Sequence, residues 1–170
     1  MVTRIERGKV KLILTACIAI LALSACATSP IPEGYTGPTA TIRDWAVPES
    51  STRARFFYVS EVDGRTIRNS LAATRAANSG RGFSLAPVVI ERKVPATVLR
   101  LKLEARTAYG APIQELVMAA RMYSVEAVIE AELKPNVTYL VRGQLEEGKT
   151  AVWLEEEGSG ERIGRNVQEK

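Results

Sequence analysis

Histidine is absent from this sequence of 170 residues. Its absence excludes Ser-His-Asp and Cys-His nucleophile pairs, and it excludes every metal site that depends on imidazole ligands. Only two cysteines are present, Cys17 and Cys26, and aromatic residues make up 6% of the chain. No lysine stands in the S-x-x-K spacing of a Ser-Lys dyad. The chemistry left for an active site is therefore that of carboxylates and hydroxyl groups.

The first 25 residues have the layout of a signal peptide. Four basic residues and one acid lie within residues 1–11, and an apolar run follows over residues 12–23. A helical run of this length rises about 18 Å, whereas the hydrocarbon core of a bilayer is about 30 Å thick. The run is therefore too short for a comfortable transmembrane helix, and it has the length of a signal-peptide core. We expect residues 1–25 to be removed.

The segment Leu23-Ser24-Ala25-Cys26 resembles the lipobox of bacterial lipoproteins, in which Leu, a small residue, Ala or Gly, and Cys follow one another. The resemblance implies that Cys26 becomes the first mature residue and is lipidated through its thiol. Each buried CH2 group contributes about 0.8 kcal/mol, so two or more acyl chains attach a protein stably to a membrane. The resemblance also implies the outer membrane, facing the periplasm, because Ala27 stands where an Asp would favour the inner membrane.

Two alternatives to the lipobox remain open. One is ordinary secretion, because Ala25-Cys26-Ala27 also fits an A-x-A cleavage site. The other is an uncleaved N-terminal helix.

The sequence divides into four parts. Residues 1–25 are the predicted signal peptide, 26–38 a flexible tether rich in proline and glycine, 39–160 a single domain, and 161–170 a polar tail that we expect to fray. Without residues 1–25 the chain holds 19 basic and 18 acidic side chains, so its charge gives no argument for nucleic-acid binding. With Cys26 used for lipid, the domain has no thiol and must rely on its apolar core.

Alternation of apolar and polar residues predicts short β-strands throughout the domain. The clearest case is 97–106, in which Leu99, Leu101, Leu103 and Ala105 would face the core while the charged residues between them face water. Further strands are expected at 39–45, 55–62, 65–68, 88–94 and 150–156, with turns at Asp63-Gly64 and Glu147-Gly148. Asn69 and Ser70 predict the start of one short helix over 71–78.

Residues 113–133 fit two patterns. Residues 113–122 carry both a helical stripe and helix-favouring residues; we assign residues 115–122 as strand and leave a helix over 113–122 open. Residues 124–133 alternate, and we expect them to form a β-hairpin with 137–145. The whole predicts a mainly β protein, an antiparallel β-sandwich of the immunoglobulin or transthyretin-like type with one short helix.

Three segments carry a second resemblance: the Asp63-Gly64 turn, Tyr139-Leu140-Val141-Arg142-Gly143, and Val152-Trp153-Leu154-Glu155 ahead of Gly158. They look like the domains of many small proteobacterial lipoproteins of unknown function. This resemblance implies no catalytic residues and no cofactor.

The candidate site residues are few. Glu155-Glu156-Glu157 would offer oxygen ligands to calcium, but consecutive residues of a strand point to alternate faces, so a solvated strand end is the expected role and no metal site is predicted. Four aromatic residues could line a ligand groove, although core packing is their commoner role: Trp45, Tyr58, Tyr139 and Trp153.

We therefore predict a lipid-anchored envelope protein that is not an enzyme. Its strand edges and aromatic side chains would bind another envelope protein or the cell-wall polymer. The alternative is a hydrolase of envelope glycan that uses a carboxylate such as Asp63 or Glu61. It would require two carboxylates that converge in a concave site about 5–9.5 Å apart.

Overall fold

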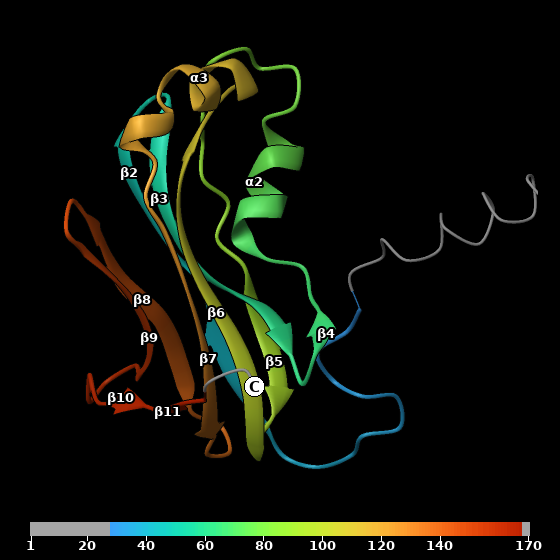
Figure 1. Cartoon of the computed structure of the whole chain (residues 1–170). Helices are drawn as coiled ribbons and strands as arrows, with labels where there is room; N and C mark the ends of the chain where they lie inside the picture. The colour runs from blue at the N-terminus through green and yellow to red at the C-terminus, as the bar shows by residue number, and fades with distance from the viewer. Residues whose placement is uncertain (1–27, 168–170) are drawn as a thin grey trace, which may run out of the picture.

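Two β-sheets packed face to face form the core of this computed structural model, which describes residues 28–167 (Figure 1). The predicted signal peptide and Cys26 lie outside the described residues. The strands of the first sheet are β1 (Thr39–Arg43), β5 (Glu91–Pro95), β8 (Thr138–Glu146), β9 (Lys149–Glu156) and β10 (Arg162–Ile163). Those of the second are β2 (Trp45–Ser50), β3 (Arg53–Val62), β4 (Arg65–Thr66), β6 (Val98–Tyr109), β7 (Ser124–Glu132) and β11 (Arg165–Asn166). The prediction of a mainly β sandwich is confirmed.

The order of strands is β10-β9-β8-β1-β5 in the first sheet and β11-β7-β6-β3-β2 in the second, with β4 paired to β3. Nearly all neighbours are antiparallel. The exception is β1, which pairs with β8 in parallel, so the sandwich is not purely antiparallel as expected.

The main core lies between the sheets and confirms the alternation in β6. Leu99, Leu101 and Leu103 are buried in it, together with Ala40 and Ile42 from β1. Burial of a leucine side chain contributes about 1.5–3 kcal/mol relative to an exposed one. This face of β6 therefore supplies much of the stability of the sandwich.

A second, smaller core lies on the outer face of the second sheet, under helix α2 (Ser70–Ala77). Ala54, Phe56 and Tyr58 of β3 pack there against Leu71 and Leu85. Phe57 and Val59, on the other face of β3, lie in the main core, so this part of β3 is buried on both faces. This explains why β3 has the most continuous apolar and aromatic sequence of the domain.

Helix α2 begins as predicted, since the Asn69 side chain accepts a hydrogen bond from the Ala72 N–H. Three of its polar side chains then bond the extended segment before β5 at 2.7–2.9 Å: Ser70 with Ile90, Thr74 with Val88, and Asn78 with Ala86. The three bonding side chains are four residues apart along the helix, which corresponds to a rise of about 6 Å. Their partners are two residues apart along the extended segment, about 6.6 Å, so the two sets of groups stay aligned. The helix replaces a neighbouring strand here, and β5 itself begins only at Glu91 rather than at residue 88.

Asp44 marks the point at which the chain leaves the first sheet for the second. It lies between β1 and β2, and its carboxylate is fully buried. The carboxylate accepts hydrogen bonds from the Val59 N–H at 3.2 Å, from the Ser70 N–H at 2.9 Å, from the Ser70 hydroxyl at 2.8 Å and from Arg92. One side chain thus joins β3, β5 and the start of α2, where a negative charge also suits the helix dipole.

The predicted hairpin of residues 124–133 and 137–145 is wrong. Strand β7 pairs with β6 and β11 in the second sheet, whereas β8 pairs with β9 and β1 in the first. The link between β7 and β8 therefore crosses from one sheet to the other. Both strands direct alternate residues into the shared core, such as Ile129 and Ala131 of β7 and Tyr139 and Val141 of β8, although Leu140 on the other face of β8 is buried as well.

Residues 112–117 and 119–121 are helical, so the assignment of 115–122 as strand is wrong and the open alternative, a helix, is present. Helix α3 (Pro112–Val117) is followed by the 3-10 turn η2 (Ala119–Arg121). Pro112 at the first helical position has no N–H to leave unbonded, and the Gln114 side chain accepts a hydrogen bond from the Ala111 N–H. α3 makes a second short helix besides α2.

Both ends of the described chain are bonded to the domain. The tail that we expected to fray forms β10 and β11, which pair with β9 and β7 and so connect the two sheets. At the other end, the predicted tether does not hang free, because Thr28 forms a bridge with Ile67 beside β4. The Tyr35 hydroxyl donates to the Pro38 carbonyl within the same segment.

Candidate functional site

A groove of about 280 Å³ lies where β2 and β3 diverge from the hairpin formed by β8 and β9. Figure 1 shows this hairpin on the side of the molecule away from α2. The residues that line the groove are Trp45, Val47, Arg55, Phe57, Arg142, Gly143, Trp153 and Glu155. Both tryptophans of the chain are among them.

Strand register brings the indole and guanidinium groups together. Asp44 points into the core, so Trp45 points outward, and its side chain remains 37% exposed. Arg142 and Trp153 are directly opposite each other on β8 and β9, and thus share one face of the sheet. The Arg142 guanidinium lies 3.7 Å from the ring centroid of Trp45, and that of Arg162 lies 3.8 Å from the ring centroid of Trp153.

These four residues, Trp45, Arg142, Trp153 and Arg162, form an alternating row of indole and guanidinium groups, which we call the Trp–Arg row. Each stacked pair contributes about 0.5–1 kcal/mol when exposed and about 2 kcal/mol when shielded from water. The row is consequently a defined surface and not a set of freely rotating side chains.

Glu155 orients the middle of the Trp–Arg row. Its Oε1 accepts a hydrogen bond from Arg142 Nε at 3.1 Å, and its Oε2 accepts one from Trp153 Nε1 at 3.0 Å. The carboxylate therefore fixes the planes of both groups. Among the bonds described for residues 28–167, the Nη groups of Arg142 donate none, so they can meet an incoming acceptor.

Gly143 gives the groove its floor. A Cβ at this position would lie 2.3 Å from the Ala151 carbonyl oxygen and 2.7 Å from Cδ1 of Phe57. Any other residue would therefore push away the Phe57 ring, which is buried in the main core. The groove is shallow because the core begins directly below Gly143.

Of the four aromatic residues predicted to line a ligand groove, two line the observed groove. Trp45 and Trp153 come together, whereas Tyr139 is buried in the main core with its hydroxyl accepting a hydrogen bond from the Lys134 N–H at 2.9 Å. Tyr58 lies in the second core, and its hydroxyl donates to Glu104 at 2.8 Å. Burial, together with the charge of Glu104 and this hydrogen bond, raises the pKa of Tyr58 well above its usual value.

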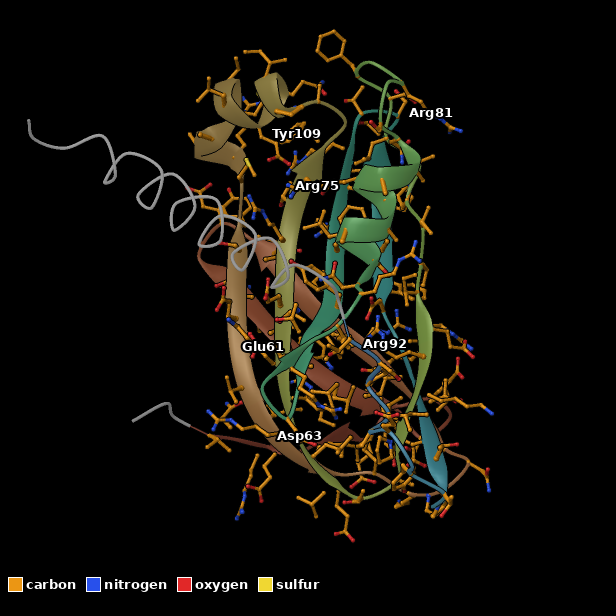
Figure 2. All side chains as sticks on the ribbon, turned by 90° about the vertical axis from the view of Figure 1, so that its right-hand side faces the viewer. Glu61, Asp63, Arg75, Arg81, Arg92 and Tyr109 are labelled. Atoms are coloured by element: carbon orange, nitrogen blue, oxygen red, sulfur yellow. The ribbon has the colours of Figure 1, made fainter. Side chains whose placement is uncertain are left out.

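The candidate carboxylates of the hydrolase hypothesis, Glu61 and Asp63, lie elsewhere, in a separate polar cleft of about 440 Å³ on the second sheet (Figure 2). Asp63 Oδ1 accepts a hydrogen bond from the Arg100 N–H at 2.9 Å, which closes the turn after β3. Glu61 lies 3.9 Å from the ammonium group of Lys102. Hydrogen bonds and ion pairs with Glu126 raise the pKa of Lys102, so this lysine stays charged beside Glu61.

The three consecutive glutamates do not converge. Glu155 bonds Arg142 and Trp153, Glu156 pairs with Lys134, and Glu157 pairs with Arg43. In the part of the chain that the structure describes, no three Asp, Glu, Cys or His side chains lie together as metal ligands. Cys26, the predicted lipidation site, is outside that part.

Sequence reasoning missed Arg142, Arg162 and Gly143. One signal was available for the first of these. If Glu147-Gly148 is a two-residue turn, facing residues are equidistant from it, which places Arg142 opposite Trp153. No comparable signal exists for Arg162, because its position depends on β10 pairing with β9.

Comparison of the chain with protein-family models, with curated proteins and with solved structures finds no match. The resemblance to small proteobacterial lipoproteins therefore remains a prediction from the sequence.

Proposed function

We propose that this chain is a lipid-anchored protein of the cell envelope whose β-sandwich binds the cell-wall polymer through the Trp–Arg row, without catalysing a reaction. The single observation that supports the choice of site is the row itself. Trp45 and Trp153 keep accessible surface while Glu155 and two arginines fix their geometry.

The chemistry of the row fits a polymer of acidic sugars. A sugar ring presents a face of C–H groups that an indole can cover, and a carboxylate on the sugar can accept hydrogen bonds from a guanidinium. The Arg142 guanidinium stacks on Trp45 of β2 and lies directly opposite Trp153 across the β8–β9 pair. A row that alternates rings and charges in this way suits a ligand that is itself a repeat of rings and charges.

The strand edges are less suited to binding than we expected from the sequence. β2 and β5 are edge strands, and pairing with an added strand would need their free N–H groups. Pro48 in β2 and Pro95 in β5 have no N–H to donate, and Glu91 and Lys93 charge the edge of β5. Such features discourage strand addition, so the aromatic groove is the better candidate.

The anchor rests on the lipobox alone. No helix among residues 28–167 is long and apolar enough to span a bilayer. Radiolabelled palmitate should mark the full chain in cells, and Cys26→Ser should remove the label. Equal labelling of the two forms would contradict the lipid anchor.

The binding proposal is tested by co-sedimentation with purified, insoluble cell-wall polymer, together with titration of tryptophan fluorescence by its soluble fragments. Because both tryptophans lie in the groove, their emission reports on the site directly. Arg142→Ala should weaken binding at least tenfold, since a charge-assisted hydrogen bond is worth about 1.5–3 kcal/mol. Arg121→Ala, an exposed arginine of η2, is the matched control and should bind normally.

The outcomes separate the candidate functions. Loss of binding in an Arg142→Ala variant that still unfolds in one cooperative thermal transition supports the site, and equal binding by both variants rejects it. If the polymer is not retained but a photoreactive group at Val47 cross-links one envelope protein, the partner is a protein. Release of soluble sugar fragments that Glu61→Gln abolishes would instead establish the hydrolase.

A further inference from the structure

One continuous stretch of the chain, residues 64–90, contains four arginines and no acidic residue. It comprises β4, which is paired to β3 in the second sheet, helix α2, which covers the outer face of that sheet, and the connection to β5. Figure 2 views this side, which we call the α2 face. It is the side opposite to the β8–β9 hairpin in Figure 1.

The arginines of the α2 face are largely available to a partner. Arg68, Arg75 and Arg81 are exposed. Arg75 pairs with Glu115 of α3 at 3.1 Å, while Arg68 and Arg81 make no ion pair within residues 28–167. Two further acids that Figure 2 shows on this side are also engaged: Glu61 lies 3.9 Å from the Lys102 ammonium group, and Asp63 accepts a hydrogen bond from the Arg100 N–H.

The start of the described chain is fixed to this same face. The Thr28 N–H and hydroxyl both donate to the Thr66 carbonyl, at 3.0 and 3.1 Å. The Arg65 guanidinium donates to the Pro30 carbonyl at 3.2 Å. Cys26 precedes Thr28 by two residues, and a residue spans at most about 3.6 Å, so the two Cα atoms are no more than about 7 Å apart.

An apolar side chain completes the face. Phe83, in the loop that follows α2, is 56% exposed, and Arg81 is two residues before it. Aromatic rings beside basic residues are typical of surfaces that sit at the level of lipid headgroups.

We infer that the α2 face lies directly on the anionic headgroups of the leaflet that carries the acylated Cys26. The inference rests on the lipid anchor of the proposed function and adds an orientation to it. Arg65 and Arg68 lie close to where the acyl chains enter, and Arg81 and Phe83 make contact farther along. The Trp–Arg row then points away from the membrane, toward a polymer in the space beyond it.

The orientation can be measured on the acylated chain in vesicles of phosphatidylethanolamine and phosphatidylglycerol. Because acylation blocks Cys26 and Cys17 belongs to the removed leader, a single introduced cysteine is the only free thiol. Fluorophores at Ala72→Cys, exposed on α2, and at Lys149→Cys, exposed at the start of β9, are compared for energy transfer to a headgroup-linked acceptor. Transfer should be strong from the first and weak from the second, and equal or reversed transfer would overturn the orientation.

Charge provides the second arm of the test. Arg68→Glu and Arg81→Glu should each reduce transfer from position 72, as should replacement of the lipids by phosphatidylcholine. Each arginine removed should weaken surface attraction about fivefold, and a charge reversal should weaken it further. Lys149→Glu is the matched control on the opposite side and should change nothing. Identical transfer in all variants would show that charge plays no part and would reject the face.

Failure of the anchor and failure of the face can be told apart. If palmitate does not label the chain, the lipid anchor is wrong. The face is then decided with the mature chain, residues 26–170, carrying Cys26→Ser, by co-sedimentation with the same vesicles at low salt. If the chain sediments with the vesicles and Arg68→Glu abolishes this, the contact between the α2 face and the lipid surface is supported. If the chain does not sediment with the vesicles, that contact is rejected. If palmitate labels the chain but energy transfer is equal from positions 72 and 149, the lipid anchor is supported and the proposed orientation is rejected.

Discussion

Replacing Asp44 by asparagine should be among the most damaging conservative substitutions in this domain. The Arg92 side chain is 7% exposed and that of Asp44 is fully buried. Within the described residues, Arg92 Nε and Nη1 have no hydrogen-bond partner, so the buried cation depends on Asp44 for its compensation. Removing one partner of a buried ion pair costs about 3–5 kcal/mol, because the other charge is left uncompensated. With a typical domain stability of about 5–15 kcal/mol, Asp44→Asn should leave the protein marginal.

The opposite partner should matter less. Arg92→Met leaves the Asp44 carboxylate with three donors, the Val59 N–H and both donors of Ser70, so we expect a cost of about 1–3 kcal/mol. The double variant should be more stable than Asp44→Asn alone, because no buried cation remains.

Urea unfolding of the mature chain, followed by tryptophan fluorescence, measures these differences. Glu91→Gln is the control, since it breaks the exposed pair of Glu91 and Arg43 and should cost no more than about 1 kcal/mol. If Asp44→Asn costs no more than this control, or if Arg92→Met costs as much as Asp44→Asn, the account of the buried pair is refuted.

Two further predictions concern the cores. Leu101→Ala should destabilise the domain by about 2–5 kcal/mol through the cavity it leaves, whereas Lys102→Ala, one residue along β6, should change stability by no more than about 0.5 kcal/mol; equal costs in denaturant unfolding would contradict the half-buried strand. The raised pKa of Tyr58 keeps it protonated in the fold while the unfolded tyrosine ionises near pH 10. Its stabilising contribution is therefore complete below about pH 10 and declines above it, and Tyr58→Phe should lessen that decline in unfolding measured from pH 8 to 11; an unchanged slope would speak against it.

The burial pattern of this protein follows from its sequence to a large extent. Alternation in β6 identifies Leu99, Leu101 and Leu103 as core residues, because a strand with one buried face must place every second side chain inside. Asn69 predicts the start of α2 because its side chain satisfies an N–H that the helix leaves unbonded. These are local effects, and they need no knowledge of the partner strand.

Pairing between strands, in contrast, is decided by the tertiary structure. Residues 124–133 and 138–146 alternate equally well as a hairpin or as members of opposite sheets, since either arrangement buries one face of each. The sequence likewise does not decide the structure of residues 112–117. Their apolar side chains are exposed, and their spacing fits the period of a helix as well as that of a strand. The Trp–Arg row depends on such distant pairings. Trp45 reaches Arg142 only because β1 runs beside β8, and Arg162 reaches Trp153 only because β10 returns to β9. Contacts between residues so far apart in the chain are set by the packing of the whole core, which no local pattern records.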